Sequence, residues 1–248
     1  MGKSLIVTGG SRGIGKAIAL GAANRGYEVC VNFRSNRDAA AEVVAEITAM
    51  GGKAIAVQAD MATEADILKL FETVDAELGP LAALVNNAGI VDRAQKVEEM
   101  SVNRLERMFA TNITGPFLCA REAVKRMSTA HGGAGGGIVN ISSVAAKLGS
   151  PGEYVDYAAS KGAIDVMTIG LAKEVAAEGI RVNAVRPGVI YTDIHASGGQ
   201  PGRVERVKGA VPMQRGGEAK EIADAALWLL SEQASYVTGA LLDASGGR

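Results

Sequence analysis

The chain opens with an apolar run, a glycine-rich turn and an alanine-rich stretch in immediate succession. Ser4–Thr8 predicts a strand, GGSRGIG follows at residues 9–15, and Lys16–Arg25 predicts a helix that ends near Gly26. This is the layout of a βαβ unit that binds a dinucleotide, because glycines let the backbone approach a pyrophosphate and the free N–H groups of the helix hold it. The spacing is Gly-x-x-x-Gly-x-Gly, not Gly-x-Gly-x-x-Gly, and an ordinary tight turn is the alternative.

Apolar strand-like runs alternate with helical periodicity along the rest of the chain. Further strands are predicted at Tyr27–Phe33, Lys53–Ala59, Leu81–Val85, Ile138–Ile141, Ile180–Val185 and Ala240–Leu242. Helices are predicted at Asp38–Met50, Thr63–Leu78, Ser101–Met127, Tyr154–Glu178 and Glu218–Leu230. Such alternation predicts an α/β fold with a doubly wound parallel sheet. With 248 residues, 48% of them hydrophobic, we expect one domain over residues 1–248.

Composition narrows the classes of function. A net charge of −1 gives no basic surface for nucleic acid, and no apolar run approaches the length of a membrane span. Cys30 and Cys119 lie in apolar surroundings and are expected to be buried thiols, not a disulfide. His131 and His195 are isolated, so no metal site is expected. A strand-like run begins at Ser4, where a signal peptide would need a longer apolar segment, and we expect a cytoplasmic protein.

Three segments interrupt the regular elements. Gly115-Pro116 should bend or disturb the helix predicted over Ser101–Met127, because proline removes a backbone donor, and Asn112 lies in that weak zone. Residues 128–137 predict a glycine-rich surface loop that precedes a strand and is therefore no phosphate cradle. Residues 193–210 are polar and contain glycines, and they predict a mobile lid over a substrate site.

Tyr157 and Lys161 are four residues apart in the helix predicted from Tyr154, so both lie on one face. An ammonium about 4 Å from a phenol is worth roughly 4 kcal/mol at an effective dielectric of about 20, or about 3 pKa units. Tyr157 is therefore a candidate proton donor and acceptor with a lowered pKa. Tyr154 has Ala158 at the same spacing. The alternative is that Lys161 pairs with Asp165 and that Tyr157 only packs.

The end of the second predicted strand bears on which nucleotide is bound. An acidic residue at this place binds the ribose hydroxyls and repels a 2′-phosphate. This strand ends Asn-Phe-Arg-Ser at residues 32–35, without an acid. Arg34, with Arg12 from the glycine turn, could clasp a phosphate, which predicts NADP(H) over NAD(H). The alternative is that both arginines are solvated loop residues.

Asp60 and Asn87 each follow a predicted strand. Sites on doubly wound sheets lie at the carboxyl ends of the strands, which makes both residues candidates for the cofactor site. Their alternative role is in turns, which aspartate and asparagine also favour.

With these residues placed, the chain resembles the short-chain dehydrogenase/reductase family nearly from end to end. Its motifs occur in the family's order and spacing: TGGSRGIG at 8–15, Asp60, NNAG at 86–89, Asn112, Ser142-Ser143, YAASK at 157–161 and RPGVIYT at 186–192. The resemblance implies a Rossmann-like sheet of about seven strands, a nicotinamide cofactor and a homotetramer or, failing that, a homodimer.

The resemblance also implies roles for particular residues. The catalytic tetrad falls on Asn112, Ser143, Tyr157 and Lys161, and Ser142 stays an alternative to Ser143 because the loop before Tyr157 is one residue longer than usual. The implied cofactor contacts are Gly9, Ser11, Arg12, Gly13, Ile14, Gly15, Arg34, Asp60, Met61, Asn87, Ala88, Gly89, Tyr157, Lys161, Pro187, Gly188, Ile190 and Thr192.

The implied activity is an NADP(H)-dependent interconversion of a carbonyl and a secondary alcohol, with Tyr157 as general acid and base. 3-Oxoacyl-(acyl carrier protein) reductases and glucose 1-dehydrogenase-like enzymes are the alternatives, and a non-catalytic NADP-binding protein is a remote one. Carrier-docking members hold basic residues where this chain has Gly132–Gly137 and Glu178, which speaks against an acyl carrier partner. His195, Ser197 and Arg203 in the lid are candidates for substrate specificity, or else exposed loop residues.

Overall fold

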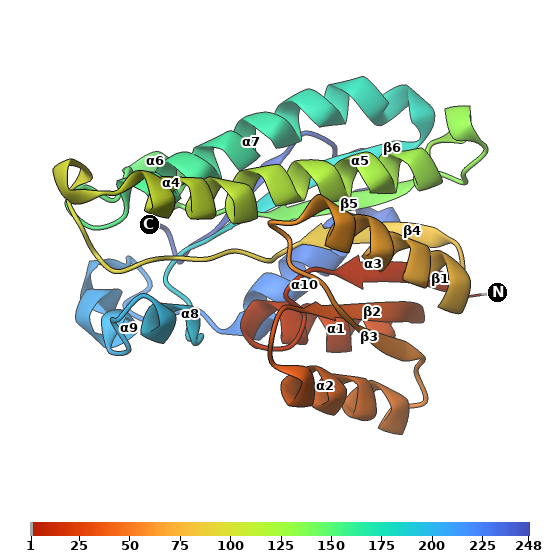
Figure 1. Ribbon diagram of the computed structural model, residues 1–248, viewed down its shortest axis with the longest axis horizontal. Helices are drawn as coiled ribbons and strands as arrows, with labels where there is room; N and C mark the ends of the chain where they lie inside the picture. Colours follow the sequence, from red (N-terminus) through yellow and green to blue (C-terminus); the bar gives the residue numbers. More distant parts are fainter. Residues whose placement is uncertain (1) are drawn as a thin grey trace.

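The computed structural model describes residues 2–248 and contains one seven-stranded parallel sheet (Figure 1). The strands are β1 (Lys3–Val7), β2 (Tyr27–Phe33), β3 (Ala54–Gln58), β4 (Leu81–Asn86), β5 (Gly136–Ile141), β6 (Ile180–Pro187) and β7 (Leu241–Ala244). Their order is β3-β2-β1-β4-β5-β6-β7, so the winding reverses direction on either side of β1. The prediction of a doubly wound parallel sheet is confirmed.

Helices cover both faces of the sheet, as Figure 1 shows. The longer ones are α1 (Gly13–Ala23), α2 (Arg37–Ala49), α3 (Glu64–Glu77), α4 (Val102–Phe109), α5 (Gly115–Met127), α7 (Val155–Val175) and α10 (Ala219–Leu230). On β1, Leu5 and Val7 pack in the core with α1, α2 and α10, whereas Ile6 packs in the second core with α3, α5 and α7. All three side chains are fully buried, which explains why this strand is a continuous apolar run and not an alternating one.

The helix expected over Ser101–Met127 is interrupted. Between α4 and α5 lies one π-helical turn, Ala110–Thr114, in which the Gly115 N–H donates to the carbonyl of Ala110, five residues back. Pro116 follows in the first turn of α5, where its missing N–H costs little. The predicted disturbance is confirmed, and its form is a π turn that contains Asn112.

Some predicted boundaries were wrong. The strand expected from Ile138 begins at Gly136, because the Gly136 N–H donates to the Gly179 carbonyl and extends the pairing of β5 with β6. The preceding loop contains a short 3-10 turn, Thr129–His131. Thr63 stands at the N-terminus of α3 as expected, but its side chain makes no capping hydrogen bond.

The segment expected as a lid contains two short helices, α8 (Ile194–Ser197) and α9 (Arg203–Val207), followed by a 3-10 turn at Lys208–Ala210. Figure 1 shows α8 and α9 beyond the carboxyl ends of the strands, at the opposite end of the molecule from the N-terminus. The short helix α6 (Ala145–Leu148) precedes α7 at the same end. Among the described residues, no helix has both the length and the apolar character needed to cross a membrane.

Gly115 shows how tightly the π turn is packed. A Cβ at this position would lie 2.2 Å from the Met61 carbonyl oxygen, so the backbone would have to move. At Gly162 in α7 a Cβ would meet nothing within 4 Å. We expect Gly115→Ala to destabilise the protein by about 1–3 kcal/mol. The control Gly162→Ala should be neutral or stabilising by up to about 1 kcal/mol. Urea unfolding measures both, and equal stabilities of the two variants would contradict the packing described here.

Candidate active site

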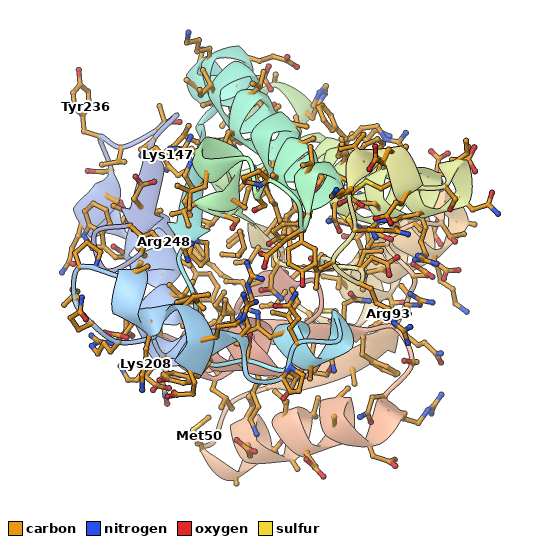
Figure 2. The ribbon with its side chains drawn as sticks, turned by 90° about the vertical axis from the view of Figure 1, so that its left-hand side faces the viewer. Met50, Arg93, Lys147, Lys208, Tyr236 and Arg248 are labelled. Atoms are coloured by element: carbon orange, nitrogen blue, oxygen red, sulfur yellow. The ribbon has the colours of Figure 1, made fainter. Side chains whose placement is uncertain are left out.

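The carboxyl ends of the strands and the segment 193–210 enclose a cavity of about 620 Å³. Figure 2 faces this end of the molecule. The predicted site residues that line the cavity are Gly9, Ser11, Arg12, Gly13, Ile14, Gly15, Arg34, Asp60, Met61, Asn87, Ala88, Gly89, Ser143, Tyr157, Lys161, Pro187, Gly188, Ile190 and Thr192. Residues from seven separate stretches of the chain are thus brought together around one space.

The glycine turn is shaped for close approach by a ligand. Gly9 and Gly13 have φ angles of 62° and 53°, which favour glycine, and a Cβ at Gly15 would lie 2.2 Å from the Gly9 carbonyl oxygen. Helix α1 begins at Gly13, so its free N–H groups face the cavity end of the sheet. The turn therefore fits the pyrophosphate of a dinucleotide.

Asn87 holds the turn in this shape. Its side-chain amide donates to the carbonyls of Thr8 (2.9 Å) and Gly9 (3.0 Å). The Thr8 hydroxyl in return accepts from the N–H groups of Asn87 and Ala88, both at 2.9 Å. The side chain predicted to contact the cofactor is thus already engaged in joining the ends of β1 and β4.

Asn32 is a site residue that the sequence analysis missed. It is buried at the end of β2, where its Oδ1 accepts from the Gly9 N–H (3.0 Å) and its Nδ2 donates to the Ala59 carbonyl (3.0 Å). It therefore fixes the glycine turn from the opposite side to Asn87. A polar residue in a buried strand, next to the strand's carboxyl end, was the signal that could have revealed it.

Arg12 and Arg34 both line the cavity at the ends of β1 and β2. The guanidinium of Arg34 lies 3.3 Å from the Asp60 carboxylate, and 64% of its side chain is exposed. β2 ends at Phe33 without an acidic residue. The end of this strand therefore has no carboxylate that would repel a phosphate beside Arg34. The donor set fits a phosphate on the adenosine ribose.

Ser143 and Ser142 are clearly separated by their surroundings. Ser142 is buried, and its hydroxyl donates to the Asp165 carboxylate (2.7 Å) and contacts the Lys161 carbonyl (3.2 Å). The side chain of Ser143 is half-buried and forms a hydrogen bond with the Tyr157 phenol that lowers the pKa of the phenol. The arrangement favours Ser143 over Ser142 as the serine that can meet a substrate.

Lys161 does not pair with Asp165. Its ammonium is buried, donates to the Ile141 carbonyl (2.8 Å) and lies 5.6 Å from the centre of the Tyr157 ring. Asp165 is instead paired with Arg186 at 2.8 Å. Burial lowers the pKa of Lys161 to about 8, and the negative charge of Asp165 opposes that shift only in part.

The expectation of a lowered Tyr157 pKa was wrong for the protein without ligands. Burial raises the pKa of the phenol, and the Ser143 hydrogen bond and the charge of Arg203 only partly offset this. The physical reason is the orientation of the Lys161 side chain, whose ammonium donates to the Ile141 carbonyl and lies beside the Tyr157 ring, not at the hydroxyl. A spacing of four residues in a helix brings two side chains to one face, but it does not bring the Lys161 ammonium to the Tyr157 hydroxyl.

Asn112 does not line the cavity. It lies buried in the π turn, where its Oδ1 accepts from the Ile90 N–H (2.8 Å) and its Nδ2 donates to the Ile90 carbonyl (2.9 Å) and Ser160 (3.2 Å). A Cβ on Gly89 would be 3.5 Å from both Asn112 Oδ1 and the Lys161 ammonium. Asn112 therefore fixes the strand β4 exit close to Lys161.

The predicted lid residues have different positions. His195 and Arg203 line the cavity, whereas Ser197 does not, and its hydroxyl contacts the Asp193 carbonyl (3.3 Å). Burial lowers the pKa of His195, whose Nε2 lies 3.0 Å from the Ile190 carbonyl oxygen. The lining residues that were not predicted include Tyr154, set aside in favour of Tyr157, and Arg248, which Figure 2 shows between Lys147 and Lys208.

The expectation of two buried, unbridged cysteines is confirmed. Cys30 and Cys119 are free, buried thiols, and burial raises the pKa of Cys119 to about 12, so neither is a reactive thiolate. Within residues 2–248 no group of three or more histidine, cysteine, aspartate or glutamate side chains could hold a metal ion.

The chain is similar to a family model and to proteins of known sequence. A family model described as "Enoyl-(Acyl carrier protein) reductase" matches residues 9–248. The chain is 60% identical over 243 residues to the uncharacterized oxidoreductase YgfF of Escherichia coli (strain K12), covering 98% of each chain. It is 40% identical to glucose 1-dehydrogenase 2 of Bacillus subtilis (strain 168), covering 99% of this chain and 94% of that protein.

A solved structure agrees with these relatives. The short chain dehydrogenase from Burkholderia cenocepacia J2315 in complex with NADP superposes with a TM-score of 0.90 at 31% identity, covering 99% of this chain and 97% of that one. The chain therefore belongs to the short-chain dehydrogenase/reductase family and is an oxidoreductase.

The lowered pKa of Lys161 predicts a pH dependence of stability. Between pH 8 and about 10.5 the unfolded chain binds a proton at this lysine that the folded protein has lost, so stability rises with pH. The gain amounts to at most about 3 kcal/mol. Urea unfolding without cofactor at pH 7.5 and 9.5 should show the rise in the parent protein, and Lys161→Met should lack it. An identical rise in the variant would contradict the burial of a charged lysine.

Proposed function

We propose that this protein is an NADP(H)-dependent oxidoreductase that interconverts a carbonyl and a secondary alcohol. The observation that carries the proposal is that Ser143 and Tyr157 line the same cavity as the glycine turn and the Arg12–Arg34 pair. A ligand bound along this cavity would place its phosphates at the turn and its reactive ring near the phenol. A bound nicotinamide supplies the hydride chemistry.

The chain's own residues are assigned as follows. Tyr157 donates a proton to the substrate oxygen during reduction and removes it during oxidation. Ser143 donates a hydrogen bond to the same oxygen as negative charge builds there. Lys161, buried and adjacent to the Tyr157 ring, holds a positive charge near the phenol, and Asn112 keeps the π turn and the end of β4 in place.

The raised pKa of Tyr157 is compatible with this assignment. A phenol that stays protonated at neutral pH is ready to donate its proton in the direction of reduction. If the Lys161 ammonium turned from the Ile141 carbonyl toward the phenol, its positive charge would lower the pKa of Tyr157. The phenolate could then accept the proton of an alcohol during oxidation.

The remaining family assignments are part of the proposal. The cavity-lining residues predicted for the cofactor are proposed to bind NADP(H), within one domain over residues 1–248 whose lid spans residues 193–210. We further propose a homo-oligomer, a tetramer or else a dimer, located in the cytoplasm. A small carbonyl or alcohol is the proposed substrate, with no nucleic acid and no membrane as partners.

One relative and the family model define the alternatives for the substrate. The 40% identity to glucose 1-dehydrogenase 2 favours a sugar as one candidate. The description of the family model points to acyl carrier substrates, but Glu178 offers no positive charge to an acidic carrier and its carboxylate accepts a hydrogen bond from Ser128. Assaying ketones, 3-oxoacyl thioesters and sugars by NADPH absorbance distinguishes these candidates.

Tyr157→Phe tests the proton donor. Because the variant keeps the ring and loses the hydroxyl, we expect turnover to fall at least about 100-fold with NADPH binding unchanged. Steady-state rates and fluorescence titration of NADPH measure the two quantities. Ser142→Ala, in which a buried hydroxyl outside the proposed chemistry is removed, serves as the matched control. Undiminished turnover of Tyr157→Phe would overturn the assignment.

Arg34→Ala tests the choice of nucleotide. Removal of one of two cations at the proposed 2′-phosphate site should raise the KM for NADPH about tenfold and leave that for NADH within about twofold. Arg37→Ala removes an exposed arginine three residues away, outside the cavity, and is the control. A parent enzyme that prefers NADH, or equal effects on both nucleotides, would contradict the proposal.

A further inference from the structure

Two walls of the cavity, formed by different segments of the chain, contact each other. One is the start of α9 with Arg203, and the other is the turn before α7 with Glu153 and Tyr154. Arg203 and Tyr154 both line the cavity. The two segments lie about fifty positions apart in the chain, and Arg203 also acts on Tyr157, because its charge partly offsets the raised pKa of the phenol.

Direct contacts join the two walls. Nη1 of Arg203 lies 2.7 Å from the Glu153 carboxylate, and the guanidinium stacks 5.0 Å from the centre of the Tyr154 ring. Arg206, one turn further along, reaches the same carboxylate at 3.4 Å. Arg203 is 16% exposed in its side chain, whereas Arg206 is 54% exposed, so the first contact is the shielded one.

This contact is charged at neutral pH. Burial alone would raise the pKa of Glu153, but its bonds to Arg203 and Arg206 outweigh that and hold the pKa below its usual range. A partly buried ion pair whose guanidinium also stacks on an aromatic ring is stronger than an exposed pair, because less water competes for the charges.

The wall formed by the turn is anchored from behind. The Glu153 carbonyl accepts from the Gln95 N–H (3.0 Å), and the Gln95 side chain accepts from Arg104 (2.8 Å). Arg104 is buried and makes a bidentate pair with Asp156, at 2.7 and 3.1 Å, beside Tyr157. The opposite wall consists of short helices separated by Gly198, Gly199 and Gly202 and has no comparable buried pair.

We propose that Glu153 and Arg203 form a clamp that closes the outer end of the cavity and restricts this enzyme to short carbonyl substrates. The proposal rests on the proposed function and deepens it by naming the substrate class. Leu148 and Val91 are apolar side chains that line the same cavity as Tyr157 and Arg203, which suits a short apolar chain beside the reacting carbonyl. A longer chain would have to displace the Arg203 guanidinium from Tyr154 and break the ion pair.

The test uses a homologous series of ethyl 3-oxoesters with four to ten acyl carbons and NADPH as the reductant. In the parent enzyme kcat/KM should fall by about tenfold or more from the shortest to the longest member, since tenfold corresponds to about 1.4 kcal/mol. Glu153→Gln and Arg203→Gln open the clamp from either wall, and both should remove most of that fall while retaining turnover of the shortest ester. Arg206→Gln is the matched control and should keep the parent preference.

The outcomes separate this inference from the proposed function. A parent enzyme indifferent to chain length, or variants that keep the parent's preference, would overturn the clamp. Broadening in Arg203→Gln alone would also overturn it, because side-chain size and not the ion pair would then be responsible. Adding Tyr157→Phe to each variant should abolish turnover of every ester, and failure there would count against the proposed function instead.

Hydrogen exchange tests the clamp without a substrate, and it applies even if the enzyme turns over the 3-oxoesters slowly. Hydrogen exchange at the amides of residues 200–207 should accelerate in both Glu153→Gln and Arg203→Gln and stay at the parent rate in Arg206→Gln. Thermal unfolding monitored alongside shows whether each variant is folded. Unchanged exchange in folded clamp variants would overturn the proposal independently of catalysis.

Discussion

The site depends on the hydrogen bonds that join the carboxyl ends of β1, β2 and β4. Asn87 and Asn32 hold the glycine turn from two sides, and the Thr8 hydroxyl ties the start of the Asn87 segment back to β1. Because the sheet order reverses at β1, these strand ends diverge and leave a space that the glycine turn borders. A turn with positive φ at Gly9 and Gly13 would have many other conformations if these bonds were absent.

A second layer of interactions positions the chemistry. The π turn moves the chain so that Asn112 can bind both backbone groups of Ile90, and this places β4's exit near the Lys161 ammonium. Lys161 is buried at an energetic cost that shows in its lowered pKa, which the negative charge of Asp165 offsets in part. Its ammonium has the Ile141 carbonyl as a backbone partner.

Much of the fold was accessible from the sequence because each element carries its own periodicity. The apolar run in β1, the glycine turn and the alanine-rich α1 follow one another in a few residues, and local chemistry determines all three. The same holds for Gly115-Pro116, whose disturbance of the helix was predictable from proline's missing donor. By contrast, the start of β5 at Gly136 depends on a hydrogen bond to Gly179, and no local pattern encodes a partner more than forty residues away.

The sequence by itself determined the class of fold, the family and most of the predicted residues that line the cavity, because motif spacing and apolar periodicity are local properties of the chain. Only the tertiary structure decided where the charged groups point. Lys161 is bonded to a backbone carbonyl, Asp165 is paired with Arg186, and Arg203 lies against Glu153 and Tyr154. Each of these partners comes from a different element, and electrostatic effects depend on direction and burial in space, which helical spacing along one segment cannot specify.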